Sequence, residues 1–284
     1  MSALRRHPLV AFFILTYLLT WSLVPFGSFF SPGPLLAAVT VLAFTQGRPG
    51  FRRLGSRLIR WRVGWIWYVA AIGVPLAVHA LTIAANVGLG ADAPSLGQLT
   101  PASGVLLVFA VRLVNPLDGP VAEEPGWRGF AQPGLQAGRT PFRATLVLGA
   151  LVAGWHLPLW LLPQFGAGPT DVISDSLASF AVTFWYAWLF NRASGSVLLT
   201  LVAHAVEGSL QVEQYWPVGA AAERTTALYA AVWCVVAVAL VLGDKKSWWP
   251  PRGSGVSDAG TLPGPAGRAA AEARPPTAAS GARS

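Results

Sequence analysis

The segment AEEPGWRGF, at residues 122–130, places two adjacent carboxylates and an arginine between long apolar runs. Glu124 and Arg128 are four residues apart with the acid on the N-terminal side, which is the favourable orientation for an ion pair on a helix. Neighbouring residues on a helix point about 100° apart, so this pairing would leave Glu123 free to face a cavity. The alternative is a pair of acids solvated at the edge of a membrane.

Two histidines in other apolar runs could complete a polar site. His156 lies in VAGWHLPLW and His204 in LTLVAHAVEG. Ionisable groups inside membrane spans are costly and are therefore functional candidates. A carboxylate with two imidazoles can activate water, directly or through a bound metal, and zinc sites often use such ligands. A single buried histidine is more often a hydrogen-bonded core residue, which is the interpretation for His79.

The composition indicates the class of protein in which this chemistry would operate. The chain has 284 residues, 54% of them hydrophobic and 11% charged, whereas soluble domains carry about 25% charged residues. Because the apolar residues fall in long blocks, we expect a multi-pass helical protein of the cell membrane, with the lipid bilayer as a partner. The net charge of +8 does not indicate a nucleic-acid partner, since the arginines cluster in short loops beside apolar runs. The lone Cys234 lies inside such a run and is expected to act as a small apolar side chain.

We predict an all-α transmembrane bundle of about eight spans. The candidate spans lie at about 8–25, 34–46, 64–86, 102–122, 144–163, 176–190, 196–212 and 225–242. Basic residues precede the first span, crowd the segment GRPGFRRLGSRLIRWR, and follow the last span. Because Lys and Arg mark cytoplasmic loops, both termini are predicted to be cytoplasmic.

The chain divides into a bundle over residues 1–243 and a tail over residues 244–284. The tail is rich in Gly, Pro, Ala and Ser, so it cannot bury enough apolar surface to order itself and is expected to be disordered. Near its start, Trp248 and Trp249 beside two lysines are typical of an anchor at the membrane interface.

The depth of the candidate residues sets a condition on the fold. His156 and His204 fall well inside the bilayer, whereas Glu123 falls near the cytoplasmic end of the 102–122 span. They can meet only if the 118–140 segment folds back into the bundle or a cytosol-open cavity reaches the histidines. Irregular backbone is tolerated at membrane depth where it lines such a cavity. Pro120 and Pro125, which argue against a regular helix, make this segment the candidate.

Three motifs in order carry a family resemblance. EEPGWR fits the pattern EExxxR, WHLP follows on a later span, and WLFNRASGSVLLTLVAHA ends in the second histidine. Together they resemble the CAAX prenyl protease and bacteriocin-processing (CPBP, or Abi) family of intramembrane metalloproteases, which is related to the type II CAAX endopeptidase. The motif-bearing region runs from about 105 to 212. The resemblance implies a hydrolase that cleaves a protein or peptide substrate at a cytosol-accessible site.

The resemblance also implies a role for each residue. Glu123 would activate the attacking water, and Glu124 and Arg128 would support it. His156 and His204 would bind zinc together with Glu123, or would be polar partners of the water in a metal-free mechanism. The expected catalytic set is therefore Glu123, Glu124, Arg128, His156 and His204, with zinc as the expected cofactor.

Two positions depart from the family pattern. The second motif commonly has Phe four residues before its histidine, where this chain has Val152. The third motif commonly has Asn or Asp four residues after its histidine, where this chain has Gly208. Glu207 and Gln211 lie on roughly the same helical face as His204 and are candidates to compensate.

Two functions of other classes stay open at this point. One is a catalytically idle membrane scaffold or bacteriocin-immunity-type family member, which the glycine at 208 favours. The other is a transporter with a proton relay through Glu123 and Glu207. Transporters often show repeated halves, and no corresponding pair of broken spans is found in the sequence.

Overall fold

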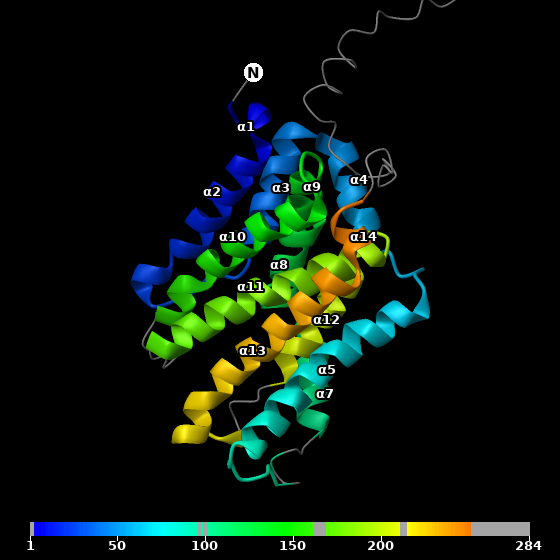
Figure 1. The fold of residues 1–284 in the computed structure, drawn as a ribbon. Helices are drawn as coiled ribbons and strands as arrows, with labels where there is room; N and C mark the ends of the chain where they lie inside the picture. Colours follow the sequence, from blue (N-terminus) through cyan, green and yellow to red (C-terminus); the bar gives the residue numbers. More distant parts are fainter. Residues whose placement is uncertain (1–2, 96–97, 99–101, 162–168, 211–214, 251–284) are drawn as a thin grey trace, which may run out of the picture.

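The computed structural model describes residues 3–95, 98, 102–161, 169–210 and 215–250. Within these residues every regular element is helical (Figure 1), which confirms the predicted all-α class. In chain order the elements are α1 (Ala3–Arg6), α2 (Pro8–Trp21), η1 (Val24–Phe26), α3 (Gly33–Thr45), α4 (Gly47–Leu58), α5 (Trp65–Gly88), α7 (Ala102–Arg112), α8 (Gly119–Gly126), η2 (Trp127–Ala131), α9 (Gln132–Gln136), α10 (Pro141–Leu161), α11 (Pro169–Arg192), α12 (Val197–Ser209), α13 (Ala220–Gly243) and α14 (Lys245–Trp248).

The lengths of these helices fit a membrane bundle. Five segments are long and apolar enough to cross a bilayer: Pro8–Phe26, Trp65–Gly88, Pro141–Leu161, Asp171–Arg192 and Ala220–Gly243. Two shorter apolar helices, Gly33–Thr45 and Val197–Ser209, accompany them. A span of the hydrocarbon core needs roughly 20 residues, so the short helices cross only part of that thickness or lie inside the bundle.

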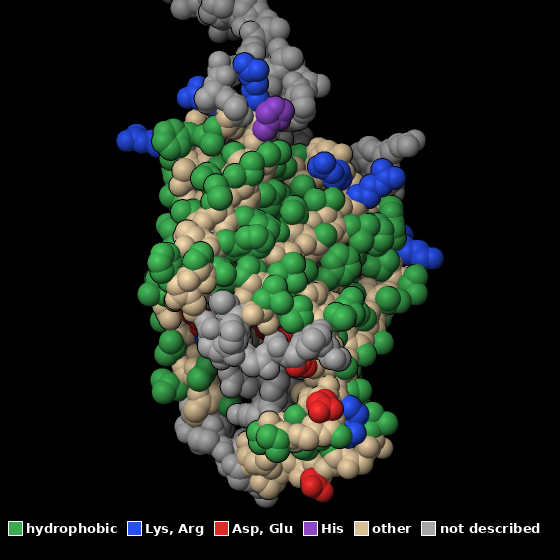
Figure 2. Space-filling model, turned by 90° about the vertical axis from the view of Figure 1, so that its left-hand side faces the viewer, with side chains coloured by type: hydrophobic (Ala, Val, Ile, Leu, Met, Phe, Trp, Pro, Cys, Tyr) green, Lys and Arg blue, Asp and Glu red, His purple; other side chains and the backbone are tan. Residues whose placement is uncertain are grey.

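The outer surface carries the apolar belt that such a bundle needs. Figure 2 shows hydrophobic side chains covering the middle of the molecule, with Lys and Arg gathered mainly toward the end from which the N-terminus emerges. Most of the acidic side chains seen in this view lie toward the opposite end. This separation fits the loop charges from which cytoplasmic termini are predicted, and that orientation stays a prediction.

The predicted span at 102–122 is wrong as a single helix. Helix α7 ends at Arg112, and a separate helix, α8, begins at Gly119. The Asp118 side chain accepts a hydrogen bond of 2.7 Å from the backbone N–H of Gly119, so it caps the new helix. Pro120 follows in the first turn, where its missing N–H costs nothing. Asp118 and Pro120 therefore start a second helix where the hydropathy pattern suggested one continuous span.

The segment after this break lies in the centre of the molecule. Helix α8 packs against α3 and α12, and nearly every residue from Gly119 to Leu135 is buried. A Cβ on Gly126 would lie 2.5 Å from the Pro34 carbonyl oxygen, so α8 and α3 approach at a distance that only glycine permits. Of the two ways in which the candidate residues could meet, the structure shows the first: the segment from Gly119 to Leu135 is buried in the bundle, and it is helical rather than irregular.

A π-helical turn, η2, follows α8 directly. Such turns are rare and are frequent at functional sites. In this chain the turn comes two residues after Pro125, which lies inside α8. Its wider winding carries the Trp127 and Arg128 side chains, both buried, into the same central region.

Two buried apolar clusters flank the central helices. One joins α5, α11, α12 and α13 around Trp185 and Trp233. The other joins α2, α3, η2 and α10 around Trp127 and Trp155. The polar residues of interest lie on α8, η2, α10 and α12.

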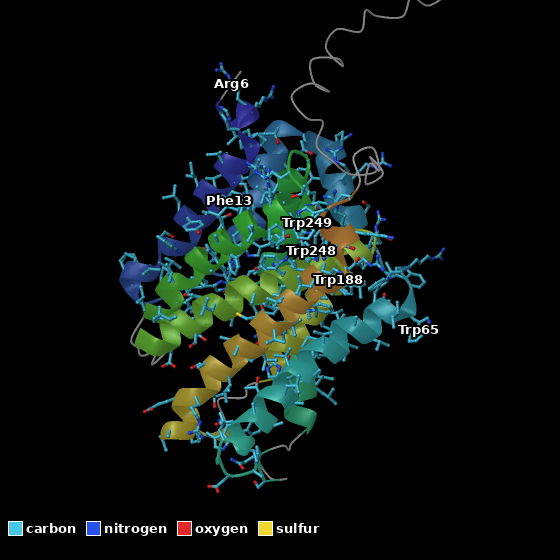
Figure 3. All side chains as sticks on the ribbon, viewed as in Figure 1. Arg6, Phe13, Trp65, Trp188, Trp248 and Trp249 are labelled. Carbon is cyan, nitrogen blue, oxygen red and sulfur yellow. The ribbon has the colours of Figure 1, made fainter. Side chains whose placement is uncertain are left out.

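The end of the described chain returns to the bundle. Trp248 of α14 is fully buried, its Nε1 donates a 3.0 Å hydrogen bond to the Leu240 carbonyl, and it packs against Phe184. Trp249 packs against Phe142 of α10. Figure 3 labels both tryptophans over the body of the bundle and Trp65 at its edge. The disorder predicted for the tail from residue 244 onward is wrong for residues 244–250, which include helix α14 and the buried Trp248. The rest of the predicted tail, residues 251–284, lies outside the described residues.

Candidate active site

Glu124, Arg128 and His204 form a buried polar triad. Arg128 Nη1 lies 3.0 Å from Glu124 Oε1, and the two side chains are 2% and 0% exposed. His204 Nδ1 lies 3.0 Å from the same carboxylate oxygen. Because a carboxylate paired with arginine can only accept, His204 must donate its Nδ1–H to Glu124, and its Nε2 is the ring nitrogen left for other partners. The ion pair expected from the i, i+4 spacing is therefore present.

Tyr186 of α11 closes this triad from one side. The Arg128 guanidinium lies over the Tyr186 ring, 4.6 Å from its centroid, and the ring of Tyr186 stacks on that of His204 at 5.6 Å. A cation over a buried aromatic face is stabilised by the ring quadrupole. Tyr186 thus restrains two side chains of the site at once.

Glu123 faces a different direction from its neighbour, as the helical angle requires. Its side chain is buried, and Trp127 Nε1 donates a 3.3 Å hydrogen bond to Oε2. His156 Nε2 lies 3.9 Å from the same oxygen. Among the described residues, these contacts bring no arginine or lysine to Glu123. Glu124, in contrast, is paired with Arg128.

The ring of His156 is fixed by its surroundings. Its Nδ1 lies 2.9 Å from the Val152 carbonyl, which can only accept, so Nδ1 carries the proton and Nε2 of the neutral ring is an acceptor aimed toward Glu123. Phe29 and Trp160 stack on the ring with interplanar angles of 11° and 16°. Val152 contributes through its backbone, so the absence of a Phe side chain there leaves this contact intact.

Gly119 marks the point on which several polar side chains converge. A Cβ on this residue would lie 3.1 Å from His204 Nε2 and 3.2 Å from Glu123 Oε1. It would also lie 3.3 Å from Arg112 Nη2. A carboxylate oxygen, an imidazole nitrogen and a guanidinium nitrogen therefore converge on the Cβ position of Gly119, each closer to it than an ordinary van der Waals contact.

A basic residue of α4 supports the π-helical turn from outside the spans. Arg57 Nη1 donates a 2.7 Å hydrogen bond to the Gly129 carbonyl. Burial, followed by repulsion from Arg53 and Arg60, lowers the pKa of Arg57 to about 10. The guanidinium stays charged at neutral pH and satisfies a carbonyl of the turn that carries Arg128.

The structure brings all five expected catalytic residues into one region and leaves the other polar candidates apart. His79 is held by the Pro75 and Leu210 carbonyls, as expected for a core histidine. Glu207 accepts a hydrogen bond from the Tyr229 hydroxyl of α13. Gln211 lies outside the described residues.

Sequence reasoning did not assign a role to Trp127, Tyr186, Gly119 or Arg112. Trp127 stands inside the EEPGWR motif, four residues after Glu123, and this spacing could have indicated contact on a helix. Arg112 could have been noticed as an ionisable group at the end of an apolar run. The contacts that Tyr186, Gly119 and Arg112 make depend on helix packing, for which the local sequence carries no signal.

The site leaves few side-chain donors for a metal ion. Among the described residues, no group of three or more His, Cys, Asp or Glu side chains is placed to hold one. Glu123 and the two histidines are adjacent, yet one ring nitrogen of each histidine is already bonded to protein. The zinc expectation stays a prediction.

Together, the fold and the site define a helical membrane protein with a buried Glu–His centre. Residues 101–208, which span α7 to α12, match the family described as type II CAAX prenyl endopeptidase Rce1-like. This region contains every residue of the centre. The motif-bearing part of the chain is therefore similar to this family, in line with the resemblance of its three motifs.

One curated relative is also similar. It is CAAX prenyl protease 2 of Methanococcus maripaludis, which is 25% identical over 137 residues. The match covers 46% of this chain and 49% of the relative, so the chain spans about half the length of the curated protein it matches.

Proposed function

We propose that the protein is an intramembrane endopeptidase in which Glu123 activates a water molecule for attack on a peptide bond. The observation that carries the proposal is that the two adjacent acids have different partners. Glu124 is bound by Arg128 and His204. Glu123 Oε1 instead lies near the Cβ position of Gly119, beside His204 Nε2. A carboxylate without a permanent cation partner keeps its lone pairs available for a water proton.

The reaction follows from these contacts. Glu123 takes a proton from water while the water oxygen bonds to the carbonyl carbon, and the carbonyl π electrons move to the oxygen. When the C=O bond re-forms, the C–N bond breaks and the proton held by Glu123 passes to the leaving nitrogen. One water is consumed, and an acid and an amine are released. His156 Nε2, an acceptor 3.9 Å from Glu123, orients the water by accepting a hydrogen bond from its second O–H, which stays on the oxygen.

The family match supports a protein or peptide substrate. The described family and the relative are named for CAAX prenyl proteolysis, and we extend only the reaction class to this chain. A cytosol-accessible site and the cell membrane as location are proposed from the loop charges. Zinc held by His156, His204 and Glu123 is tested by metal analysis of the purified protein, in which one bound zinc that is lost in His156→Ala would add a metal to this scheme.

A comparison of protein N-termini tests the proposal even though the substrate is unidentified. Cells expressing the wild-type chain or Glu123→Gln at equal level are compared across membrane and exported proteins. Glu223→Gln, an exposed acid in the first turn of α13, is the matched control. We expect new N-termini in the wild-type and Glu223→Gln cells that are absent with Glu123→Gln.

Identical N-termini in all three cultures, with each protein folded in the membrane, would reject proteolysis. That result would favour the catalytically idle scaffold, whose fold and polar centre would be the same.

A further inference from the structure

Arg112, the last residue of α7, occupies space that Gly208 of α12 leaves open. A Cβ on Gly208 would lie 2.6 Å from Arg112 Cζ and 3.0 Å from its Nε, and closer still to Nη2. Any side chain at 208 would therefore displace the guanidinium. The glycine four residues after His204 makes room for a cation that comes from another helix.

The guanidinium is held in this place by one partner on the chain. Arg112 Nη1 lies 3.3 Å from Asp118 Oδ2, and Asp118 is fixed by capping α8 through Gly119. Arg112 Nε is buried without a hydrogen-bond partner among the described residues. A buried donor without a partner is costly, so the group is poised to bind an acceptor that the protein does not supply.

The remaining nitrogen, Nη2, approaches the same point as the Glu123 and His204 side chains. It lies 3.3 Å from the Cβ position of Gly119, which is 3.2 Å from Glu123 Oε1 and 3.1 Å from His204 Nε2. The side chain of Arg112 is 20% exposed, so it is not sealed off from an entering substrate. A positive donor and the proposed water-activating carboxylate thus lie at similar distances from one point, the Cβ position of Gly119.

We propose that Arg112 is a catalytic residue that binds the carbonyl oxygen of the scissile peptide bond. This inference rests on the proposed function. As water adds to the carbonyl carbon and Glu123 takes its proton, the π electrons become a negative charge on that oxygen, and Arg112 Nη2 donates a hydrogen bond to it. When the tetrahedral intermediate collapses, the charge returns to the C=O bond and the C–N bond breaks. Arg112 neither gains nor loses a proton.

The competing interpretation is a purely structural Arg112–Asp118 ion pair at the α7–α8 break. This interpretation accounts for the contact between Arg112 Nη1 and Asp118, but it leaves three features unexplained. These are the glycine at 208, the bare Nε and the approach of Nη2 to the space at Gly119. The two interpretations differ in what they predict for turnover in a folded variant.

The test measures cleavage of a substrate found through its Glu123-dependent N-terminus, using the full chain reconstituted in liposomes. Arg112→Gln is compared with Arg143→Gln, an exposed arginine at the start of α10. We expect Arg112→Gln to lower kcat about 10²-fold, the usual loss for one donor to an oxyanion, with KM nearly unchanged. Guanidinium ion added to Arg112→Ala is expected to restore part of the turnover, and equal urea is not.

A second variant changes the same space from the other helix. Gly208→Ala keeps Arg112 and improves helix propensity, but its Cβ displaces the guanidinium. We expect a loss of kcat similar to that of Arg112→Gln, and no further loss in the double variant, because both act on one interaction.

Each result bears on a defined claim. If the wild type and Arg112→Gln cleave alike while Glu123→Gln is inactive, the role of Arg112 is overturned and the proposed function stands. The role of Arg112 is also overturned if the loss of kcat in Arg112→Gln is fully explained by a smaller fraction of folded protein. If the wild type shows no Glu123-dependent cleavage, the proposed function fails and this inference fails with it.

Discussion

At the scale of single residues, two adjacent glutamates on one helix have different surroundings, because neighbouring helical side chains point about 100° apart. Glu124 is bound by Arg128 and His204, while Glu123 meets Trp127 and His156. The sequence was sufficient to predict this division, because the i, i+4 spacing selects Glu124 for the arginine.

The buried Glu124–Arg128 pair leads to a prediction on stability. Arg128→Ala leaves the Glu124 carboxylate, which is 0% exposed, without its cation, and breaking such a pair typically costs about 3–5 kcal/mol. We expect a loss of this size in the free energy of unfolding in detergent, partly recovered by adding Glu124→Gln. Arg143→Ala is the exposed control, and equal stability of the two arginine variants would contradict a structural role for the pair.

Other parts of the site could not be predicted at this scale. The Arg112 side chain approaches Gly119 because α7 ends at Arg112 and a separate helix, α8, begins at Gly119. The sequence marks Arg112 as an ionisable group near an apolar run, but its partner at Gly208 is almost a hundred positions away. Only helix packing brings the two together.

At the scale of elements, the central question is how a short helix is held at the middle of the bundle. Hydropathy predicted one span over 102–122, because apolar residues continue on both sides of the break. The break itself depends on a cap at Asp118 and a proline in the first turn of α8, which are local signals that an apolar average does not register.

The contact between α8 and α3 can be tested at Gly126. A Cβ there would lie 2.5 Å from the Pro34 carbonyl oxygen and 2.6 Å from its carbon, and backbone cannot yield as a side chain can. We expect Gly126→Ala to lower the free energy of unfolding by about 1–3 kcal/mol, the usual cost of overpacking. It should also lower turnover, because α8 carries Glu123.

Gly73→Ala in α5 is the matched control, since a Cβ there meets nothing within 4 Å. Thermal unfolding and cleavage are measured for both. A Gly126→Ala protein as stable and active as Gly73→Ala would show that α8 and α3 are not fixed against each other.

At the scale of the whole molecule, composition and block length were enough to predict a helical membrane bundle. They could not predict that the last described residues pack on it. Trp248 was expected to be an interfacial anchor beside the lysines, and it is fully buried against Phe184. Its partners lie in α11 and α13, which the tail composition does not indicate.

The tail and its base should therefore respond differently to change. Deleting residues 251–284, which we expect to be disordered and not catalytic, should leave unfolding and cleavage unchanged. Trp248→Ala should lower the free energy of unfolding by about 3 kcal/mol, as is usual for a buried tryptophan. Unfolding in detergent, followed by tryptophan fluorescence, measures both; a destabilised truncation, or an unaffected Trp248→Ala, would contradict this division.

The central claim is that Glu123 activates the water that cleaves a peptide bond. The most direct measurement is the cleavage rate of one identified substrate by the full chain in liposomes, comparing the wild type with Glu123→Gln at matched folded fraction. A general base typically contributes about 10²–10⁴-fold, so we expect a loss in this range with substrate binding retained. Turnover by folded Glu123→Gln equal to that of the wild type would contradict the claim.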